Sequence, residues 1–149
     1  MNKMMTLLAS VMLLASACTG KQASEKTASG LEPANFRTEV DGKQTDLFVL
    51  KNKNGMEVCI TNFGGRIVSV MVPDKDGVMR DVVLGFDKLE DYFDNPACFG
   101  ATIGPVANRT AGATITIAGT DWHMPANEGV NNLHSDLEHG LHKRVWDVE

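Results

Sequence analysis

The 149-residue chain carries 14 Lys and Arg against 19 Asp and Glu, which gives a net charge of −5 at pH 7. This acidic balance argues against nucleic acid and against an anionic lipid surface as binding partners, because either would require a basic patch. The length corresponds to one domain at most.

The first residues have the pattern of an export signal. Residues 6–14 form an uncharged apolar run that is too short to span a bilayer as a helix, which favours a signal peptide over residues 1–17. Cys18 directly follows the small residues 15–17, so it is a candidate for lipid attachment. We therefore expect a lipoprotein on the periplasmic face of a bacterial envelope membrane. A periplasmic or secreted protein, cleaved without lipidation, is the alternative.

Residues 18–35 are expected to attach the lipid and then form a flexible tether. Between residues 19 and 33, Leu31 is the only large aliphatic side chain among Lys, Ser, Ala, Thr, Gly and Glu. Such a composition buries too little apolar surface to order itself. Residues 1–17 hold one lysine and no acid, so their removal makes the net charge −6 and leaves the argument against nucleic acid unchanged.

From residue 36 onward the sequence has the pattern of an antiparallel all-β protein. Short runs rich in Val, Ile, Thr and Phe alternate with Asp-Gly and Asn-Gly turns about every ten residues. The Asp-Lys-Asp-Gly run at 74–77 lacks the third acidic position and the distant glutamate of a calcium-binding EF-hand loop, so we interpret it as a turn. The expected strands cover residues 36–40, 45–50, 56–61, 66–72, 78–86, 114–117, 122–125 and 144–148, and one helical turn is expected over residues 87–92.

Three cysteines permit one disulfide, but only Cys59 and Cys98 remain if Cys18 carries lipid. Both lie in apolar stretches, which favours two buried free thiols over a bridge.

Two polar clusters, at residues 108–109 and 131–134, form the candidate binding site. The chain between Arg109 and His134 is long enough for a strand, a turn and a return strand, so both side chains can reach the same end of a β-structure. Arg109 offers a planar fork of N–H donors for hydroxyl oxygens, and an imidazole can donate or accept near neutral pH. Taken alone, however, Arg109 is more typical of a surface arginine paired with an acid, and His134 of a structural histidine.

These clusters and their neighbours resemble the aldose 1-epimerase (galactose mutarotase) family. The resemblance covers residues 36–149, and it implies a large antiparallel β-sandwich of the galactose mutarotase type, much longer than this chain. We therefore expect the fold to be incomplete at the C-terminus, where the predicted strand 144–148 would be left as an exposed edge. The residues that carry the resemblance are Phe-Gly-Gly-Arg-Ile at 63–67, Val-Leu-Gly-Phe at 83–86, Gly-Pro-Val-Ala-Asn-Arg at 104–109, Asn-Asn-Leu-His at 131–134 and Lys-Arg-Val-Trp at 143–146.

The resemblance implies an isomerase that interconverts the α and β anomers of galactose, glucose or a related aldose by acid/base ring opening, without a metal or other cofactor. We expect the protein to be a monomer. The resemblance assigns Asn108, Arg109 and His134 to binding of the monosaccharide. The family's proton-donating histidine and its glutamate base correspond to sequence beyond Glu149, so the resemblance assigns no catalytic residue within this chain. We expect this fragment alone to be inactive.

Two positions depart from the family pattern. Many members have Gly-Arg where this chain has Gly104-Pro105, and His-Gly-Gly where it has His134-Ser135-Asp136. The first change removes a charge and the second stiffens a glycine loop, which bears on substrate preference rather than on the fold. We also expect Asn108 to form hydrogen bonds in its turn and Trp146 to lie in the core.

Other functions compete with an epimerase. His134, His139 and His142, with Glu138 among them, could bind zinc, but only His139 and His142 have a familiar ligand spacing. A non-catalytic carbohydrate-binding β-sandwich lipoprotein would bind sugar without exchanging anomers, and a purely structural surface lipoprotein would do neither. A histidine and a glutamate facing Arg109 and His134 would distinguish the epimerase from both.

Overall fold

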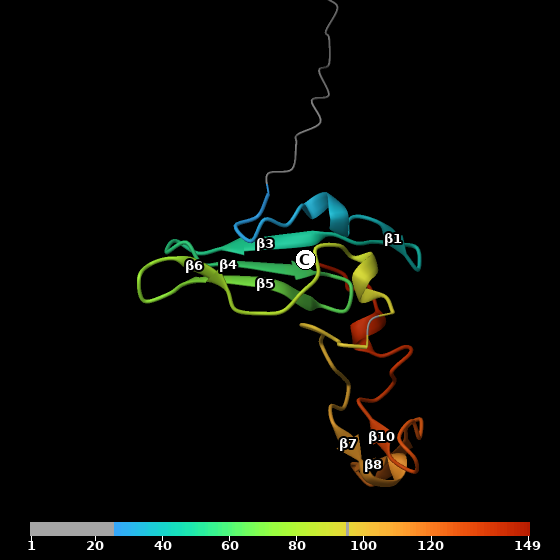
Figure 1. The fold of residues 1–149 in the computed structure, drawn as a ribbon. Coiled ribbons are helices and arrows are strands. Elements are labelled where there is room, and N and C mark those ends of the chain that lie inside the picture. Colours follow the sequence, from blue (N-terminus) through green and yellow to red (C-terminus); the bar gives the residue numbers. More distant parts are fainter. Residues whose placement is uncertain (1–25, 95) are drawn as a thin grey trace, which may run out of the picture.

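The computed structural model describes residues 26–94 and 96–149, which form short strands joined by turns (Figure 1). The predicted signal peptide and Cys18 lie outside the described residues. Within the described part, no helix has the length and apolar character needed to cross a membrane. In chain order, with η for 3₁₀-helices, the elements are η1 (Pro33–Phe36), β1 (Glu39–Val40), β2 (Lys43–Gln44), β3 (Leu47–Lys51), β4 (Glu57–Thr61), β5 (Arg66–Pro73), β6 (Met79–Asp81), η2 (Glu90–Tyr92), β7 (Arg109–Thr110), η3 (Ala111–Ala113), β8 (Thr114–Ile117), β9 (Thr120–His123), β10 (Asn132–Leu133) and η4 (Leu141–Lys143).

The main sheet is antiparallel, with strand order β3-β4-β5-β6. Asp74 closes the turn between β5 and β6, because its Oδ1 accepts the N–H groups of Asp76 and Val78. Its Oδ2 accepts a hydrogen bond from Arg80 Nε at 2.8 Å. The bond from Arg80, followed by the two backbone bonds, lowers the pKa of the Asp74 carboxyl below its usual value. The run 74–77 is therefore a turn, as predicted, and both oxygens of the Asp74 carboxylate accept hydrogen bonds from its neighbours.

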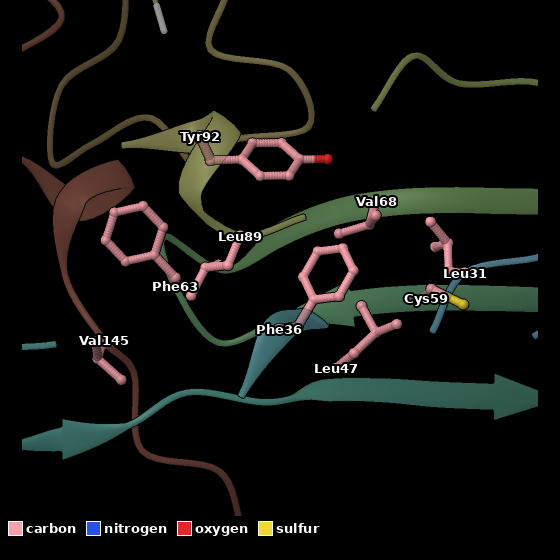
Figure 2. Packing of buried hydrophobic residues seen from close by; sticks show 9 residues of the cluster. All are labelled: Leu31, Phe36, Leu47, Cys59, Phe63, Val68, Leu89, Tyr92 and Val145. Atoms are coloured by element: carbon pink, nitrogen blue, oxygen red, sulfur yellow. The ribbon is translucent and has the colours of Figure 1, made fainter. Parts of the chain in front are cut away.

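A β-bulge in β5 shapes the covered face of the main sheet. Cys59 pairs with Ser69 while Ile60 pairs with Ile67, so Val68 is the extra residue. Val68 and Ser69 are consequently both buried, and the face they share carries the core. Figure 2 shows the nine residues of this core, which are Leu31, Phe36, Leu47, Cys59, Phe63, Val68, Leu89, Tyr92 and Val145.

The described part of the predicted tether, residues 26–35, is ordered against the main sheet, contrary to our expectation. Leu31 is 6% exposed and belongs to the core. The N–H of Ala28 donates to Glu57 Oε1 at 2.6 Å, while Lys51 pairs with the other oxygen of this buried carboxylate at 2.9 Å. The segment is held because it supplies a polar partner to Glu57 as well as an apolar side chain.

Several predicted strands are shorter than expected. The run 36–40 begins inside η1, and the run 78–86 is extended only at β6, where the Asp81 carboxylate takes the N–H of Val70 at 3.0 Å. The run 144–148 makes only one bridge, between Val145 and Phe63. Trp146 is 38% exposed, so its prediction as a core residue is wrong.

Other predictions hold. Residues 114–117 form β8, η2 lies within the predicted helical turn, and antiparallel all-β structure is confirmed. Cys59 and Cys98 are both free thiols, although only Cys59 is fully buried. Among the described residues, the remaining sheets have two strands each, and none of comparable size faces the main sheet.

We call residues 103–141 the site lobe, because they contain the predicted binding residues. The lobe carries β7 to β10, which project away from the main sheet (Figure 1). The pairs β7-β10 and β8-β9 are antiparallel. Ala118 and Gly119 have φ angles of 51° and 81°, as a two-residue hairpin turn between β8 and β9 requires.

Candidate functional site

The two predicted polar clusters meet in the short β7-β10 sheet. Arg109 is the register partner of Leu133, and Thr110 that of Asn132. This pairing places Asn108 and Arg109 beside His134, as the sequence predicted. Asn108 and Arg109 are exposed and His134 is partly buried.

Asn108 and His134 form reciprocal hydrogen bonds. The N–H of His134 donates to the carbonyl of Asn108 at 3.0 Å, and the N–H of Asn108 donates to His134 Nδ1 at 2.9 Å. A backbone N–H is always a donor, so Nδ1 is an acceptor and the neutral imidazole carries its proton on Nε2. His134 can therefore present an N–H donor to a hydroxyl oxygen.

The backbone is left-handed at Asn108, His134 and Ser135, with φ angles of 62°, 57° and 65°. Non-glycine residues in this region cost free energy and persist only where their surroundings hold them. Ser135 supplies one restraint, because its Oγ accepts the N–H of Val106 and donates to the carbonyl of the same residue, both at 2.7 Å. A glycine would fit this backbone conformation without strain.

Asn132 supplies the second restraint, from a fully buried side chain. Its Oδ1 accepts the N–H of Ser135 at 2.9 Å, and its Nδ2 donates to the carbonyls of Ser135 and Pro125. Asn127 acts similarly on Leu133, accepting its N–H at 2.6 Å and donating to its carbonyl at 2.9 Å. The loop that presents His134 is thus held by two amide side chains, Asn132 from a buried position and Asn127 from an exposed one.

Arg109 forms an ion pair with Glu128. Arg109 Nε lies 2.7 Å and 2.9 Å from the two carboxylate oxygens, and Nη2 lies 2.6 Å from Oε1. The hydrogen bond to Glu128, followed by the charge of the carboxylate, raises the pKa of the guanidinium. Nη1 takes no part in the pair. The guanidinium therefore holds Glu128 through Nε and Nη2 and keeps Nη1 as a donor for another acceptor.

Sequence reasoning missed four residues of this site: Glu128, Asn132, Asn127 and Ser135. The Asn-Asn run at residues 131–132 is polar, but nothing in it distinguishes a buried bracing amide from an exposed one. The resemblance implies a glycine where this chain has Ser135, and this is the one available signal, because glycine is typical of a left-handed backbone.

The neighbouring histidines make separate contacts. His139 Nδ1 lies 3.3 Å from Asp136 Oδ2, and His142 Nε2 lies 3.2 Å from the carbonyl of Leu137. His142 is 2% exposed, and its burial lowers the pKa of the imidazole below its ordinary value. Within residues 26–94 and 96–149, no group of three or more His, Cys, Asp or Glu is gathered as a metal site would require.

A hollow of about 420 Å³ lies on the lobe next to the bracing residues. Asn127 and Asp136 contribute polar groups to its wall, and neither Arg109 nor His134 lines it. The hollow is lined by Pro125, Asn127, Asp136, Leu137, Glu138 and His139.

Comparison with known proteins identifies the family. The family model described as aldose 1-epimerase matches residues 46–149. The chain belongs to the aldose 1-epimerase family. Galactose mutarotase of Mus musculus is 38% identical over 105 residues, which cover 70% of this chain and 30% of the mouse protein. Aldose 1-epimerase of Escherichia coli (strain K12) is 37% identical over 108 residues, covering 72% and 31%.

Solved structures agree with the family's fold. An aldose epimerase homologue from C. elegans superposes with a TM-score of 0.63 at 33% identity, covering 70% of this chain and 32% of that structure. Galactose 1-epimerase from Lactobacillus acidophilus gives a TM-score of 0.62 at 28% identity, covering 74% and 32%. The predicted fold is confirmed, and the chain spans about a third of the length of these relatives.

Proposed function

We propose that this chain supplies the sugar-binding part of an aldose 1-epimerase acting on galactose, glucose or a related aldose. The observation that carries the proposal is the β7-β10 pairing, which brings Asn108, Arg109 and His134 together. Arg109 and the Nε2–H of His134 offer donors to sugar hydroxyls, while Glu128, Asn132 and Ser135 hold them in place.

Anomer exchange requires more than binding. A base takes the proton of the C1 hydroxyl, the bond between C1 and the ring oxygen breaks, and an acid protonates that oxygen before the aldehyde rotates and the ring recloses. Both groups must lie within about 3 Å of the atoms they serve. Of the described histidines, His142 is buried against Leu137 and His139 is bonded to Asp136. We propose that the acid and base belong to sequence beyond Glu149.

The chain as given should therefore bind D-galactose and leave anomer exchange at the spontaneous rate. Binding is measured by NMR titration, and exchange by polarimetry on freshly dissolved α-D-galactose. Arg109→Ala and His134→Ala should each weaken binding, and in a longer protein with the acid and base each should lower kcat/KM about tenfold or more. His123→Ala, at an exposed ring of β9, is the control.

The outcomes separate the two functions. Binding without exchange in a longer protein would identify a non-catalytic carbohydrate-binding protein. Exchange by the 149-residue chain that disappears in His134→Ala would assign the acid to His134 and refute our division of roles.

We further propose that the protein is exported as a lipoprotein attached at Cys18, on the strength of the apolar run 6–14 and the cysteine that follows small residues. We also propose that it is a monomer. Intact-mass analysis of membrane fractions should find a lipid-modified N-terminus at Cys18. An unmodified thiol in the soluble fraction would remove the lipid anchor and leave export standing. Light scattering of the solubilised protein tests the monomer.

A further inference from the structure

Arg66 is a buried cation whose hydrogen-bond acceptors are backbone carbonyls. It is 1% exposed; its Nη1 donates to the carbonyl of Phe99 at 3.2 Å, and its Nη2 to that of His142 at 3.0 Å. The guanidinium carbon lies 5.3 Å from the ring centroid of Tyr92 and 5.7 Å from that of Phe63. Burial lowers the pKa of the guanidinium, which stays charged because arginine is not deprotonated in proteins.

The two carbonyls that Arg66 binds lie on either side of the site lobe in the sequence. Phe99 lies just before the lobe and His142 just after it, so one side chain joins the stretch that leads to Arg109 and the stretch that returns from His134. We propose that Arg66 is a positioning residue of the sugar site, a clamp that fixes how the lobe is seated on the main sheet. This inference rests on the proposed function for its sugar-binding consequence, while the clamp itself is testable without sugar.

Other bonds at the base of the lobe converge on the same turn between β4 and β5. Thr102 donates from its N–H to the carbonyl of Gly64 at 3.2 Å and from its Oγ1 to that of Gly65 at 2.9 Å. The N–H of Gly64 donates to the carbonyl of Arg144 at 2.7 Å. Gly64 also has no room for a Cβ, which would collide with the carbonyl of His142. The turn is shaped to receive both ends of the lobe around Arg66.

The contacts within the lobe explain why its orientation on the main sheet matters for the site. Its strands bond to one another, β7 to β10 and β8 to β9, and the N–H of Met124 donates to the carbonyl of Ala113 at 2.8 Å. These bonds lie within the lobe, whereas the bonds of Arg66 and Thr102 lie at its base, where it projects from the main sheet (Figure 1). A small rotation at the base would displace Arg109 and His134 together relative to any group placed elsewhere on the sheet.

The test compares Arg66→Lys and Arg66→Met with Arg80→Met, an exposed arginine of β6 paired with Asp74. Backbone amide NMR spectra are recorded for each variant, followed by D-galactose titration. Arg66→Met should shift the amides of residues 99–109 and 134–146, leave those of β3 in place, and weaken galactose binding about tenfold. Arg66→Lys, which keeps the charge and one donor, should show a smaller effect of the same kind, and Arg80→Met should show neither.

Three other outcomes would each overturn either the clamp or the proposed function. Unchanged site amides and unchanged galactose affinity in a folded Arg66→Met would overturn the clamp. Loss of the β3 and β4 amides in Arg66→Lys would show that Arg66 supports the whole fold, which also overturns a positioning role. If the parent chain does not bind galactose, the proposed function fails, and the amide shifts alone decide whether Arg66 seats the lobe.

Discussion

Replacing Ser135 by alanine and by glycine separates two opposing contributions to the stability of the site loop. The Ser135 side chain is 4% exposed and makes two hydrogen bonds to the backbone of Val106, while its own backbone has φ of 65°. Both substitutions delete the hydroxyl. Because each lost hydrogen bond costs about 1 kcal/mol, we expect Ser135→Ala to lower the free energy of unfolding by about 2 kcal/mol.

Glycine also removes the Cβ that is strained at this φ. That relief is worth about 1–2 kcal/mol, whereas the greater freedom of glycine in the unfolded chain costs about 0.4–1 kcal/mol. Relief is the larger contribution, so Ser135→Gly should be more stable than Ser135→Ala by roughly 0.5–1 kcal/mol.

Urea unfolding, followed by circular dichroism and by the fluorescence of Trp122 and Trp146, measures both variants. Ala126→Gly, at an exposed lobe residue outside the positive-φ set, should instead be less stable than its parent. A Ser135→Gly variant less stable than Ser135→Ala would refute our reading of residue 135 as a strained position that suits glycine.

Two further predictions concern the core and the base of the site lobe. Burial lowers the pKa of His142 from 6.5, so the unfolded chain takes up its proton first and stability should fall as the pH drops below 6.5. His142→Gln should therefore lose less stability between pH 7 and pH 5 than the parent, with His123→Gln, at an exposed ring, behaving like the parent; equal pH dependence in all three would contradict this. Gly100→Ala should destabilise by about 2 kcal/mol or more, because its Cβ would collide with the carbonyl of Ile67 at a φ of 61°, whereas Gly77→Ala, at φ of 79° in open space, should cost only about 1 kcal/mol. Similar urea midpoints for the two glycine variants would refute the close approach at Gly100.

The hairpins of the main sheet were predictable because their information is local. β3, β4 and β5 begin or end within two residues of the predicted runs, since alternating Val and Ile side chains and Gly-containing turns act over a few neighbouring positions. The predicted strand at residues 78–86 ends early for a reason that is only partly local. Asp81 Oδ1 accepts the N–H of Val83 within the run and that of Val70 on the adjacent strand, and no pattern within 78–86 reveals the second partner.

The same limit explains the N-terminal segment. Composition correctly describes residues 26–35 as poor in apolar groups, but Ala28 and Leu31 are fixed by Glu57 and by the core of a sheet that begins later in the chain. At the site, the resemblance supplied Asn108, Arg109 and His134, which the structure brings together. It could not supply Glu128 as the partner of Arg109, because that contact depends on the return path of the loop between β9 and β10.

Glu128 therefore distinguishes a positioned arginine from an ordinary surface pair. Arg109 and Glu128 are 59% and 34% exposed in their side chains, so solvent screens their attraction and the pair contributes little to stability. Glu128→Gln should leave the urea midpoint nearly unchanged. It keeps one acceptor oxygen but removes the charge and the second acceptor that hold Nε and Nη2, so the guanidinium should lose its fixed direction.

If that direction serves the sugar, D-galactose binding in the NMR titration should weaken about threefold in Glu128→Gln. Asp121→Asn removes an exposed acid from β9 without touching Arg109, and it should leave the affinity unchanged. Tighter binding in Glu128→Gln would mean that the carboxylate competes with the sugar for the same donors. The Arg109–Glu128 pair would then be a surface contact that the sugar displaces. The orientation of the bound sugar would have to come from His134 and from the loop that Asn132 and Ser135 brace.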